Sequence, residues 1–461
     1  MSEPQLKRVV TAPQVVALGF GAMIGWSWVL LTMNWVRDAG TFGAPLAFAI
    51  GGMAIMLIAL LYAELAAAMP RVGGEHVYVL RALGPRWSFW CSWSLIMAYV
   101  TVCVFEAVAL PTAVEFLLPV ITFHELWEVQ GSPVDAGFVV IGVVGACTVT
   151  VTNLLGIRTA ALLQGVVTIM IVLSGLFLIV GGATAGSLER AGPAFSGGIA
   201  GIAAVVMIVP AMLVGFDVIP QSAEEVDVEP RRMGVLLALS VLVAIIWYAA
   251  ISFSVALGLS PAQLNDSQMG TADAASSLWG TPLAGQLLVV GGVGGILTSW
   301  NALLLGASRL VYAMAKDGML PAVFARLHPR WNTPYAAIIG IGVLCCFGPL
   351  AGRTILVWLV DAGSFAIVIA YIFVGFAFLA LRRNEPDMPR PLRLPYGMLI
   401  GRVALVMAIA LFCLYLPFSP AGLLWPQEWL ITLGMMVSGA LVYWRYRSHI
   451  DAVRLETSGS D

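Results

Sequence analysis

Apolar segments recur along nearly the whole chain and are separated by shorter polar connections. An apolar helix of about 20 residues is long enough to cross the hydrocarbon core of a bilayer. The pattern predicts twelve such spans, at residues 14–37, 43–69, 87–118, 135–155, 159–182, 198–220, 233–259, 283–315, 335–351, 354–381, 398–417 and 427–446. We therefore expect an all-α integral membrane protein with twelve transmembrane helices.

The first of these segments is poorly suited to a continuous helix. Gly19, Gly21 and Gly25 fall within seven positions, and each interior glycine costs a helix roughly 0.5–1 kcal/mol relative to alanine. In lipid, a broken helix is tolerated only where protein buries it or where it lines a cavity. Because the N–H groups freed at the start of a half-helix attract anions, the segment predicts a binding site.

The sixth segment, 198–220, carries a second interruption. It contains Pro210, Gly215 and Pro220 together with the carboxylate of Asp217. Interrupted spans at corresponding positions of two halves point to the binding site of a transporter built from inverted repeats. The spacing predicts one repeat over residues 14–182, an inverted copy over 198–381 and two further spans over 398–446. Residues 1–13 and 447–461 would then be the two tails.

Composition and charge agree with a membrane protein and suggest its orientation. Of the 461 residues, 60% are hydrophobic and 10% are charged, whereas a soluble protein carries about 25% charged residues. With twelve spans, 20 of the 23 Lys and Arg residues fall on the side of the N-terminal tail. Cytoplasmic connections are enriched in these residues, so we expect both tails in the cytoplasm and the protein in the plasma membrane (cell inner membrane).

The chain lacks the sequence patterns of metal, cofactor or nucleotide chemistry. Its six cysteines lie in apolar segments and its four histidines are scattered, which argues against a metal site. The G-x-S-x-G and G-x-x-x-x-G-K-[ST] patterns are missing from the sequence, although hydrolases and ATP-binding proteins use them. We expect no enzymatic activity, no cofactor and no nucleic-acid partner. A channel is disfavoured, because two interrupted helices fit alternating access better.

Short motifs follow one another in a recognisable order over residues 14–396. They are Gly21-Ala22-Met23-Ile24-Gly25, Tyr62-Ala63-Glu64-Leu65, Pro70-Arg71-Val72-Gly73-Gly74-Glu75, Gly215-Phe216-Asp217 and Tyr312-Ala313-Met314-Ala315-Lys316-Asp317-Gly318. In these motifs the chain resembles permeases of the amino acid–polyamine–organocation (APC) superfamily. The resemblance implies a LeuT-type fold of five plus five inverted helices, broken in helices 1 and 6. It also implies transport of amino acids by alternating access, coupled to protons or as exchange. A permease for polyamines or small cationic amines without a carboxylate is the alternative.

The resemblance further implies which residues hold the substrate. The backbone N–H groups of span 1 would bind the substrate carboxylate, and the residues concerned are Gly25, Trp26 and Ser27. The carbonyls of span 6 would bind the substrate ammonium, and the residues concerned are Ala211, Met212, Val214 and Gly215. Trp26 replaces a small residue common in the family, so its indole either narrows the pocket or offers a ring face to a cation.

Two carboxylates lie inside predicted spans, where a charge costs about 2.5–3.5 kcal/mol. Glu106 is expected to carry a proton or balance an amine, and a structural hydrogen bond to a broken helix is the alternative. Asp217 is expected to act in gating, and capping of the second half-helix is the alternative. Some members of the superfamily couple protons through a lysine in span 5. This chain has Ile169-Met170-Ile171 there, so proton coupling would need a carboxylate.

Further polar residues have weaker interpretations. Thr298 and Ser299 are adjacent hydroxyls, which hold a sodium ion in related folds, although such residues are also common in helix packing. Acidic residues at the inner helix ends are expected to pair with arginines nearby in sequence. The acids are Glu64, Glu224 and Glu225, and the arginines include Arg71, Arg231 and Arg232.

Overall fold

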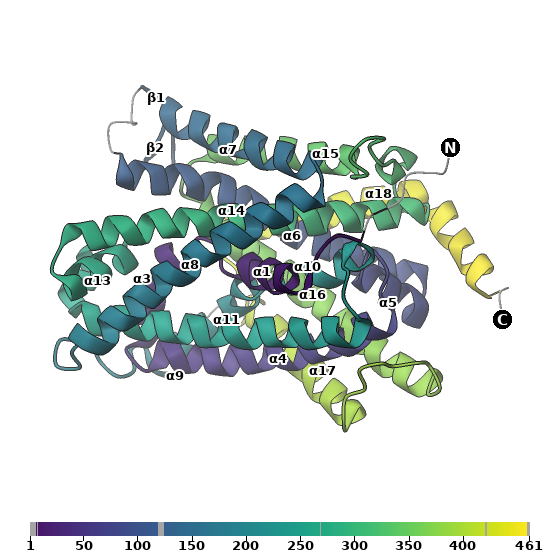
Figure 1. Cartoon of the computed structure of the whole chain (residues 1–461), viewed down its shortest axis with the longest axis horizontal. Coiled ribbons are helices and arrows are strands. Elements are labelled where there is room, and N and C mark those ends of the chain that lie inside the picture. Colours follow the sequence, from purple (N-terminus) through teal and green to yellow (C-terminus); the bar gives the residue numbers. More distant parts are fainter. Residues whose placement is uncertain (1–5, 7, 119–123, 268, 420–421, 459–461) are drawn as a thin grey trace.

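The computed structural model of the chain describes residues 6, 8–118, 124–267, 269–419 and 422–458. Nearly all of its regular structure is helical (Figure 1). The α-helices are α1 (Ala12–Met23), α2 (Ser27–Leu30), α3 (Thr32–Ala39), α4 (Gly43–Ala68), α5 (Glu75–Leu83), α6 (Pro85–Leu117), α7 (Ala136–Leu154), α8 (Ile157–Ala185), α9 (Gly198–Met212), α10 (Val218–Gln221), α11 (Pro230–Gly258), α12 (Pro261–Asp266), α13 (Gly270–Trp279), α14 (Pro282–Lys316), α15 (Tyr335–Phe347), α16 (Ile355–Asn384), α17 (Gly397–Leu414) and α18 (Gln427–Ser458). Strands β1 (Glu125–Val129) and β2 (Ser132–Asp135) form an antiparallel hairpin. Short 3-10 helices lie at Ala223–Glu225, Ala322–Ala325 and Gly348–Ala351.

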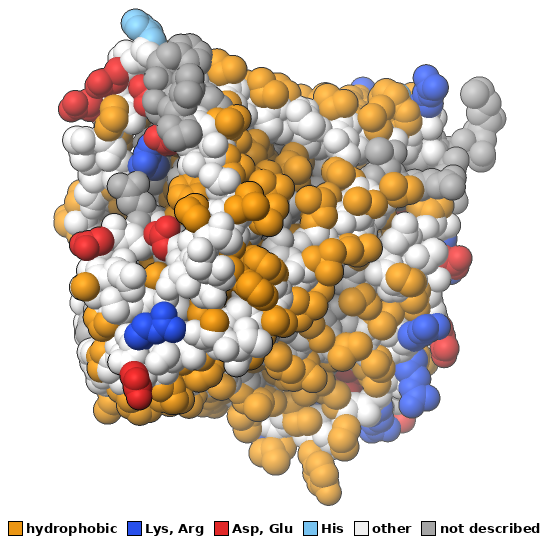
Figure 2. Space-filling view, turned by 60° about the vertical axis from the view of Figure 1, so that its left-hand side comes forward, with side chains coloured by type: hydrophobic (Ala, Val, Ile, Leu, Met, Phe, Trp, Pro, Cys, Tyr) orange, Lys and Arg blue, Asp and Glu red, His pale blue; other side chains and the backbone are white. Residues whose placement is uncertain are grey.

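The helices form a bundle suited to a membrane. Within the described ranges, eight helices are long and apolar enough to cross a bilayer: α4, α6, α7, α8, α11, α14, α16 and α17. Helices α1 and α9 and the segment Tyr335–Ala351 are shorter and apolar. In Figure 2, hydrophobic side chains cover most of the visible face, and charged side chains gather toward two of its sides. The chain is therefore a multi-pass membrane protein.

The helix ends follow the predicted spans closely, with informative differences. The first predicted span is divided into α1, α2 and α3, and the sixth into α9 and α10. Helix α18 continues past position 446 to Ser458, so most of the segment expected as a C-terminal tail is helical. The expected N-terminal tail lies partly outside the described residues. The sequence reading missed α5, α12, α13 and the hairpin, which lie in connections between predicted spans.

Helix α1 lies in the middle of the bundle and packs against α8, α11 and α14. Around it, α4 packs along α11, and α6 packs against both α14 and α16. Gly295 on α14 illustrates how close the packing is, because a Cβ there would lie 2.6 Å from the carbonyl oxygen of Gly25. The interruption of the first span is thus enclosed by protein, as a broken helix in lipid requires.

Buried ion pairs join helices at the end of the bundle that holds the N-terminal segment. The guanidinium of Arg309 donates to both carboxylate oxygens of Glu225 at 2.9 and 3.0 Å, and neither side chain is more than 2% exposed. Glu64 is bound by Arg382 and lies 3.2 Å from Arg390. Glu64 and Glu225 thus form ion pairs as expected, but with partners other than Arg71, Arg231 and Arg232.

Candidate functional site

The break in the first span is held open by a tyrosine from a distant helix. Helix α1 ends at Met23 and α2 begins at Ser27. The hydroxyl of Tyr248, on α11, donates to the free carbonyl of Met23 at 2.7 Å and lies 3.2 Å from the hydroxyl of Ser27. One side chain therefore contacts both sides of the break, and no sequence pattern indicated this role.

The break in the sixth span depends on a glycine. Gly215 has φ +125°, and a Cβ there would lie 2.5 Å from the Cβ of Ala22, so a side chain would clash with α1. Asp217 accepts the N–H of Gly215 at 2.9 Å. The carboxylate thus binds a backbone N–H of the break itself and makes no side-chain cap on α10, which differs from the expected capping of the second half-helix.

A small cavity lies between the two breaks. Its volume is about 30 Å³, which is the space that one water molecule occupies in the liquid. Seven of the residues singled out from the sequence line it: Gly25, Ser27, Glu106, Ala211, Met212, Val214 and Ser299. Most other lining side chains are apolar, and they include Val102, Phe105, Leu359 and Val360. The lining does not include Trp26, Thr298, Gly215 or Asp217.

Glu106 is the acidic side chain that lines this cavity and is 1% exposed. Its Oε1 accepts a hydrogen bond from the hydroxyl of Ser299 and lies against Gly25 of the first break. Its Oε2 is buried and has no hydrogen-bond partner among the described residues. Glu106 therefore lies beside the backbone segment that is expected to bind the carboxylate of a substrate.

Two of the other candidates contact the neighbouring helix α14 or belong to it. The indole of Trp26 is fully buried and packs against Gly292 of α14 rather than lining the cavity. Thr298 donates to the carbonyl of Gly295 in its own helix at 3.0 Å. Thr298 and Gln164 both lie against Gly21 of α1. The side-chain amide of Gln164 donates a hydrogen bond to the carbonyl of Ala17, also on α1, at 3.3 Å.

A second polar cluster lies next to the break in the sixth span. Gln221 donates to Glu75, the first residue of α5, and Glu75 and Asp217 are close enough to interact electrostatically. Several buried polar atoms here have no hydrogen-bond partner among the described residues: Glu75 Oε1, Asp217 Oδ2, Gln221 Oε1 and the hydroxyls of Tyr62, Tyr78, Tyr99 and Tyr371.

Glu75 is itself fully buried, in the connection between α4 and α6. Burial raises its pKa well above the ordinary range, and the nearby carboxylate of Asp217 raises the pKa further. Gly73 and Gly74, with φ +97° and +42°, turn the chain into α5. The sequence contained Glu75 within a motif, but nothing in it indicated that this residue would meet span 6.

Comparison with known proteins gives consistent results along nearly the whole chain. Residues 11–441 match the family described as amino acid permease. The branched-chain amino acid permease BcaP of Bacillus subtilis is 27% identical over 424 residues, which cover 90% of this chain and 88% of that protein. The methylthioribose transporter of Bacillus subtilis is 25% identical over 450 residues, 96% of this chain and 94% of that protein. The cationic amino acid transporter 4 of Homo sapiens is 29% identical over 411 residues, 84% of this chain and 62% of that protein. These names describe transporters rather than enzymes.

Proposed function

This chain belongs to the amino acid permease family within the APC superfamily, and on that premise we propose that it is a secondary active transporter that moves amino acids across the membrane by alternating access. The proposed architecture has twelve transmembrane helices. Residues 14–182 and 198–381 form the five-helix inverted repeats of a LeuT-type fold, and two further helices lie over 398–446. Both termini lie in the cytoplasm, and the membrane is the plasma membrane. The uneven distribution of Lys and Arg supports this orientation.

The observation that carries the proposal is the cavity enclosed by the two helix breaks. Residues of both breaks line one space inside the bundle, and seven of the lining residues were implicated by the sequence. In transporters built from inverted repeats, such broken helices form the substrate site. The cavity holds about 30 Å³, so the site must widen to admit an amino acid.

In the proposed complex, the substrate carboxylate lies on the N–H groups of Gly25, Trp26 and Ser27. Its ammonium faces the carbonyls of Ala211, Met212 and Val214, with Gly215 giving the backbone its turn. The apolar walls then surround the side chain of the substrate. This lining supports amino acids with apolar side chains, and the name of the Bacillus subtilis branched-chain permease agrees with it.

Glu106 supplies the proposed coupling to protons. Its carboxyl group lies against Gly25 at the first break, so an arriving substrate carboxylate is repelled there when Glu106 is ionised. Protonation of Glu106 removes this repulsion. A protonated Glu106 can donate to the Ser299 hydroxyl, which in turn donates to the carbonyl of Gly295, 2.9 Å away. Transport is then proton-coupled, or proceeds as exchange when Glu106 keeps its proton throughout the cycle.

The predicted sodium site at Thr298 and Ser299 has weaker support than this proton site. The Ser299 hydroxyl binds Glu106, and the Thr298 hydroxyl binds its own helix. The Ala17 carbonyl, on α1 beside Thr298, accepts the amide of Gln164. These contacts favour a proton over sodium as the coupling ion.

Asp217 has the proposed gating role. It caps the break in span 6 with one oxygen and directs the other into the cluster of Glu75 and buried tyrosines. When the helices part, water can reach these unpaired polar atoms, which offsets the cost of their burial. The cluster would therefore favour an open inner gate once the substrate is bound.

Substrate-induced stabilisation of the purified protein tests the proposal. A ligand that binds only the folded state raises stability by about 2.7 kcal/mol at a hundredfold excess over Kd. We expect leucine, isoleucine or valine to raise the melting temperature, and their decarboxylated amines to leave it unchanged. Stabilisation by the amines alone would instead support the permease for amines without a carboxylate. The absence of a shift with any amino acid would contradict the proposed site.

A further inference from the structure

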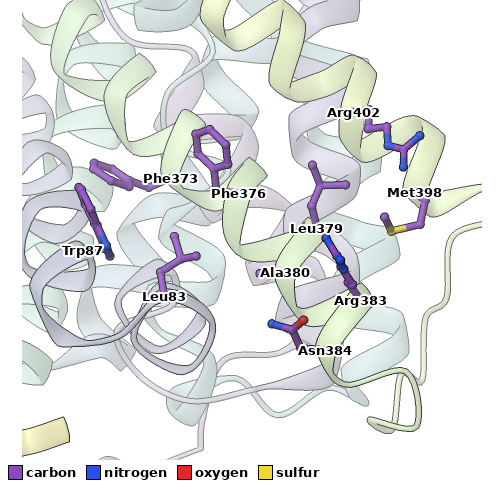
Figure 3. A pocket seen from close by; sticks show the side chains of 10 residues that line it. All are labelled: Leu83, Trp87, Phe373, Phe376, Leu379, Ala380, Arg383, Asn384, Met398 and Arg402. Carbon is purple, nitrogen blue, oxygen red and sulfur yellow. The ribbon is translucent and has the colours of Figure 1, made fainter.

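A surface groove of about 790 Å³ lies away from the cavity between the helix breaks. It is formed by residues from the end of α5, the start of α6, the last turns of α16 and the first turns of α17 (Figure 3). All of these helix ends lie on the side of the bundle that the proposed topology places in the cytoplasm. The groove therefore meets the inner leaflet of the membrane.

Two exposed arginines, Arg383 on α16 and Arg402 on α17, line this groove. No ion pair joins either of them to a carboxylate in the part of the chain that the structure describes. Neighbouring arginines differ, because Arg81, Arg86 and Arg382 each bind a carboxylate. The groove thus carries two positive charges that have no counter-ion among the described residues.

The position of Arg402 makes this lack of a counter-ion significant. It lies five residues after Gly397, the first residue of α17, and a rise of 1.5 Å per residue places it about 8 Å along the helix. The remaining residues of α17 are uncharged and almost all apolar. An arginine at this depth extends its guanidinium toward the headgroups, because a charge in the hydrocarbon is costly.

The rest of the groove is apolar and partly aromatic. Trp87 is 53% exposed and Phe376 is 46% exposed, and the rings of Trp87 and Phe373 lie 5.8 Å apart. Trp87 and Phe373 lie at one end of the groove, and Arg402 and Met398 at the other (Figure 3). Exposed aromatic side chains of this kind are common where a membrane protein meets the headgroup region.

We propose that this groove binds an anionic glycerophospholipid of the cytoplasmic leaflet. The phosphate lies between Arg383 and Arg402, and an acyl chain runs along Trp87, Phe373 and Phe376. A guanidinium binds phosphate oxygens through paired, charge-assisted hydrogen bonds. The cytoplasmic leaflet is rich in anionic lipid, and basic pockets between helices on that side bind lipid headgroups. The two unpaired charges therefore select this ligand over a neutral lipid.

Binding of phosphatidylglycerol to the purified full-length chain tests the proposal. Arg383→Gln/Arg402→Gln removes both charges from the groove. Arg231→Gln/Arg232→Gln is the matched control, because it removes two exposed arginines at the start of α11, outside the groove. The measurements are bound lipid by native mass spectrometry and the melting temperature after addition of phosphatidylglycerol, phosphatidylcholine or inorganic phosphate.

We expect phosphatidylglycerol to bind the wild type and to raise its melting temperature more than phosphatidylcholine does. Each arginine near the membrane surface contributes about 1 kcal/mol to the binding of an anionic lipid, so loss of both should weaken phosphatidylglycerol binding on the order of 30-fold in the groove variant. The control variant should bind this lipid as the wild type does. Equal effects of the two lipids would overturn the proposal, as would equal binding by both double variants. Full stabilisation by inorganic phosphate would show a simple anion site and would overturn it as well.

Discussion

The buried carboxylates of this protein differ in how their charge is balanced. Glu225 and Glu64 are buried and are bound by arginines. Glu106, Asp217 and Glu75 are equally buried, yet no ion pair joins them to a basic side chain in the described ranges. Because an unpaired buried charge is unfavourable, these three carboxyls are suited to bind and release protons, as are the buried Asp361 and Glu428, which also have no ion pair in the described ranges.

At Glu106, we expect substitution by glutamine to separate coupling from binding. Glu106→Gln preserves the size of the side chain but cannot lose a proton. In proteoliposomes, an inward proton gradient should stimulate amino acid uptake by the wild type and leave the variant unaffected, while the variant still exchanges substrate. Glu115→Gln is the control, because Glu115 is partly exposed and bound to Arg353 at 2.7 Å. A gradient response in the Glu106 variant equal to that of the wild type would contradict the proposed coupling.

At Glu75, the raised pKa predicts how stability changes with pH. The folded state keeps the proton at pH values where the unfolded chain, with a pKa near 4.3, has lost it. Unfolding free energy therefore falls as pH rises above that value, by about 1.4 kcal/mol per pH unit until the folded pKa is reached. Thermal unfolding of Glu75→Gln between pH 5 and pH 8 should show a shallower decline than the wild type. Parallel curves for the two proteins would show that Glu75 is charged in the folded state.

At the scale of helices, the two unwound segments are held in place by contacts with other helices. Tyr248 of α11 binds the end of α1 and approaches the start of α2. Gly215 allows the sixth span to approach Ala22. The two breaks therefore depend on tertiary contacts as well as on local glycine content.

We expect Tyr248→Phe to weaken the first break. The substitution removes the hydrogen bond to the Met23 carbonyl, and leaving a buried carbonyl unpaired costs about 1–3 kcal/mol. Melting temperature and stabilisation by amino acid should both decrease. Tyr396→Phe is the control, because Tyr396 is 84% exposed. If both variants melt as the wild type does, the Tyr248 hydroxyl does not support the break.

The sequence anticipated these elements where the signal is local. Glycines at 19, 21 and 25, and Pro210 with Gly215, predicted interruptions close to where α1 and α9 end. The apolar segments predicted the long helices within a few residues. Tyr248, Glu75 and the arginine partners of Glu64 could not be found in this way. Their roles depend on contacts between residues more than 100 positions apart, which neither periodicity nor spacing reveals.

At the scale of the whole molecule, the structure is closed around an almost filled site. The cavity has room for about one water, and buried ion pairs join helices on the proposed cytoplasmic side. Arg309 and Glu225 are 84 positions apart in sequence and form a bidentate pair. Such contacts must separate or shift before the cavity can open to that side.

We expect Arg309→Gln to be strongly destabilising, because it leaves Glu225 buried without its counter-ion. Loss of one partner of a buried pair costs about 3–5 kcal/mol, whereas Arg81→Gln, in an exposed pair with Glu385, should cost about 1 kcal/mol or less. Chemical unfolding of the detergent-solubilised variants compares the two. The double variant Glu225→Gln/Arg309→Gln should recover part of the loss. Equal effects of the two single arginine substitutions would contradict a structural role for this pair.

Counterflow in proteoliposomes tests the central claim most directly. Purified protein is reconstituted into vesicles loaded with unlabelled leucine, and entry of external radiolabelled leucine is followed over time. If the protein transports amino acids by alternating access, the label should accumulate transiently inside the vesicles. This accumulation should be absent from empty vesicles and from vesicles loaded with isoamylamine, the decarboxylated analogue of leucine. If no amino acid produces counterflow while the reconstituted protein remains folded, the proposed function is wrong.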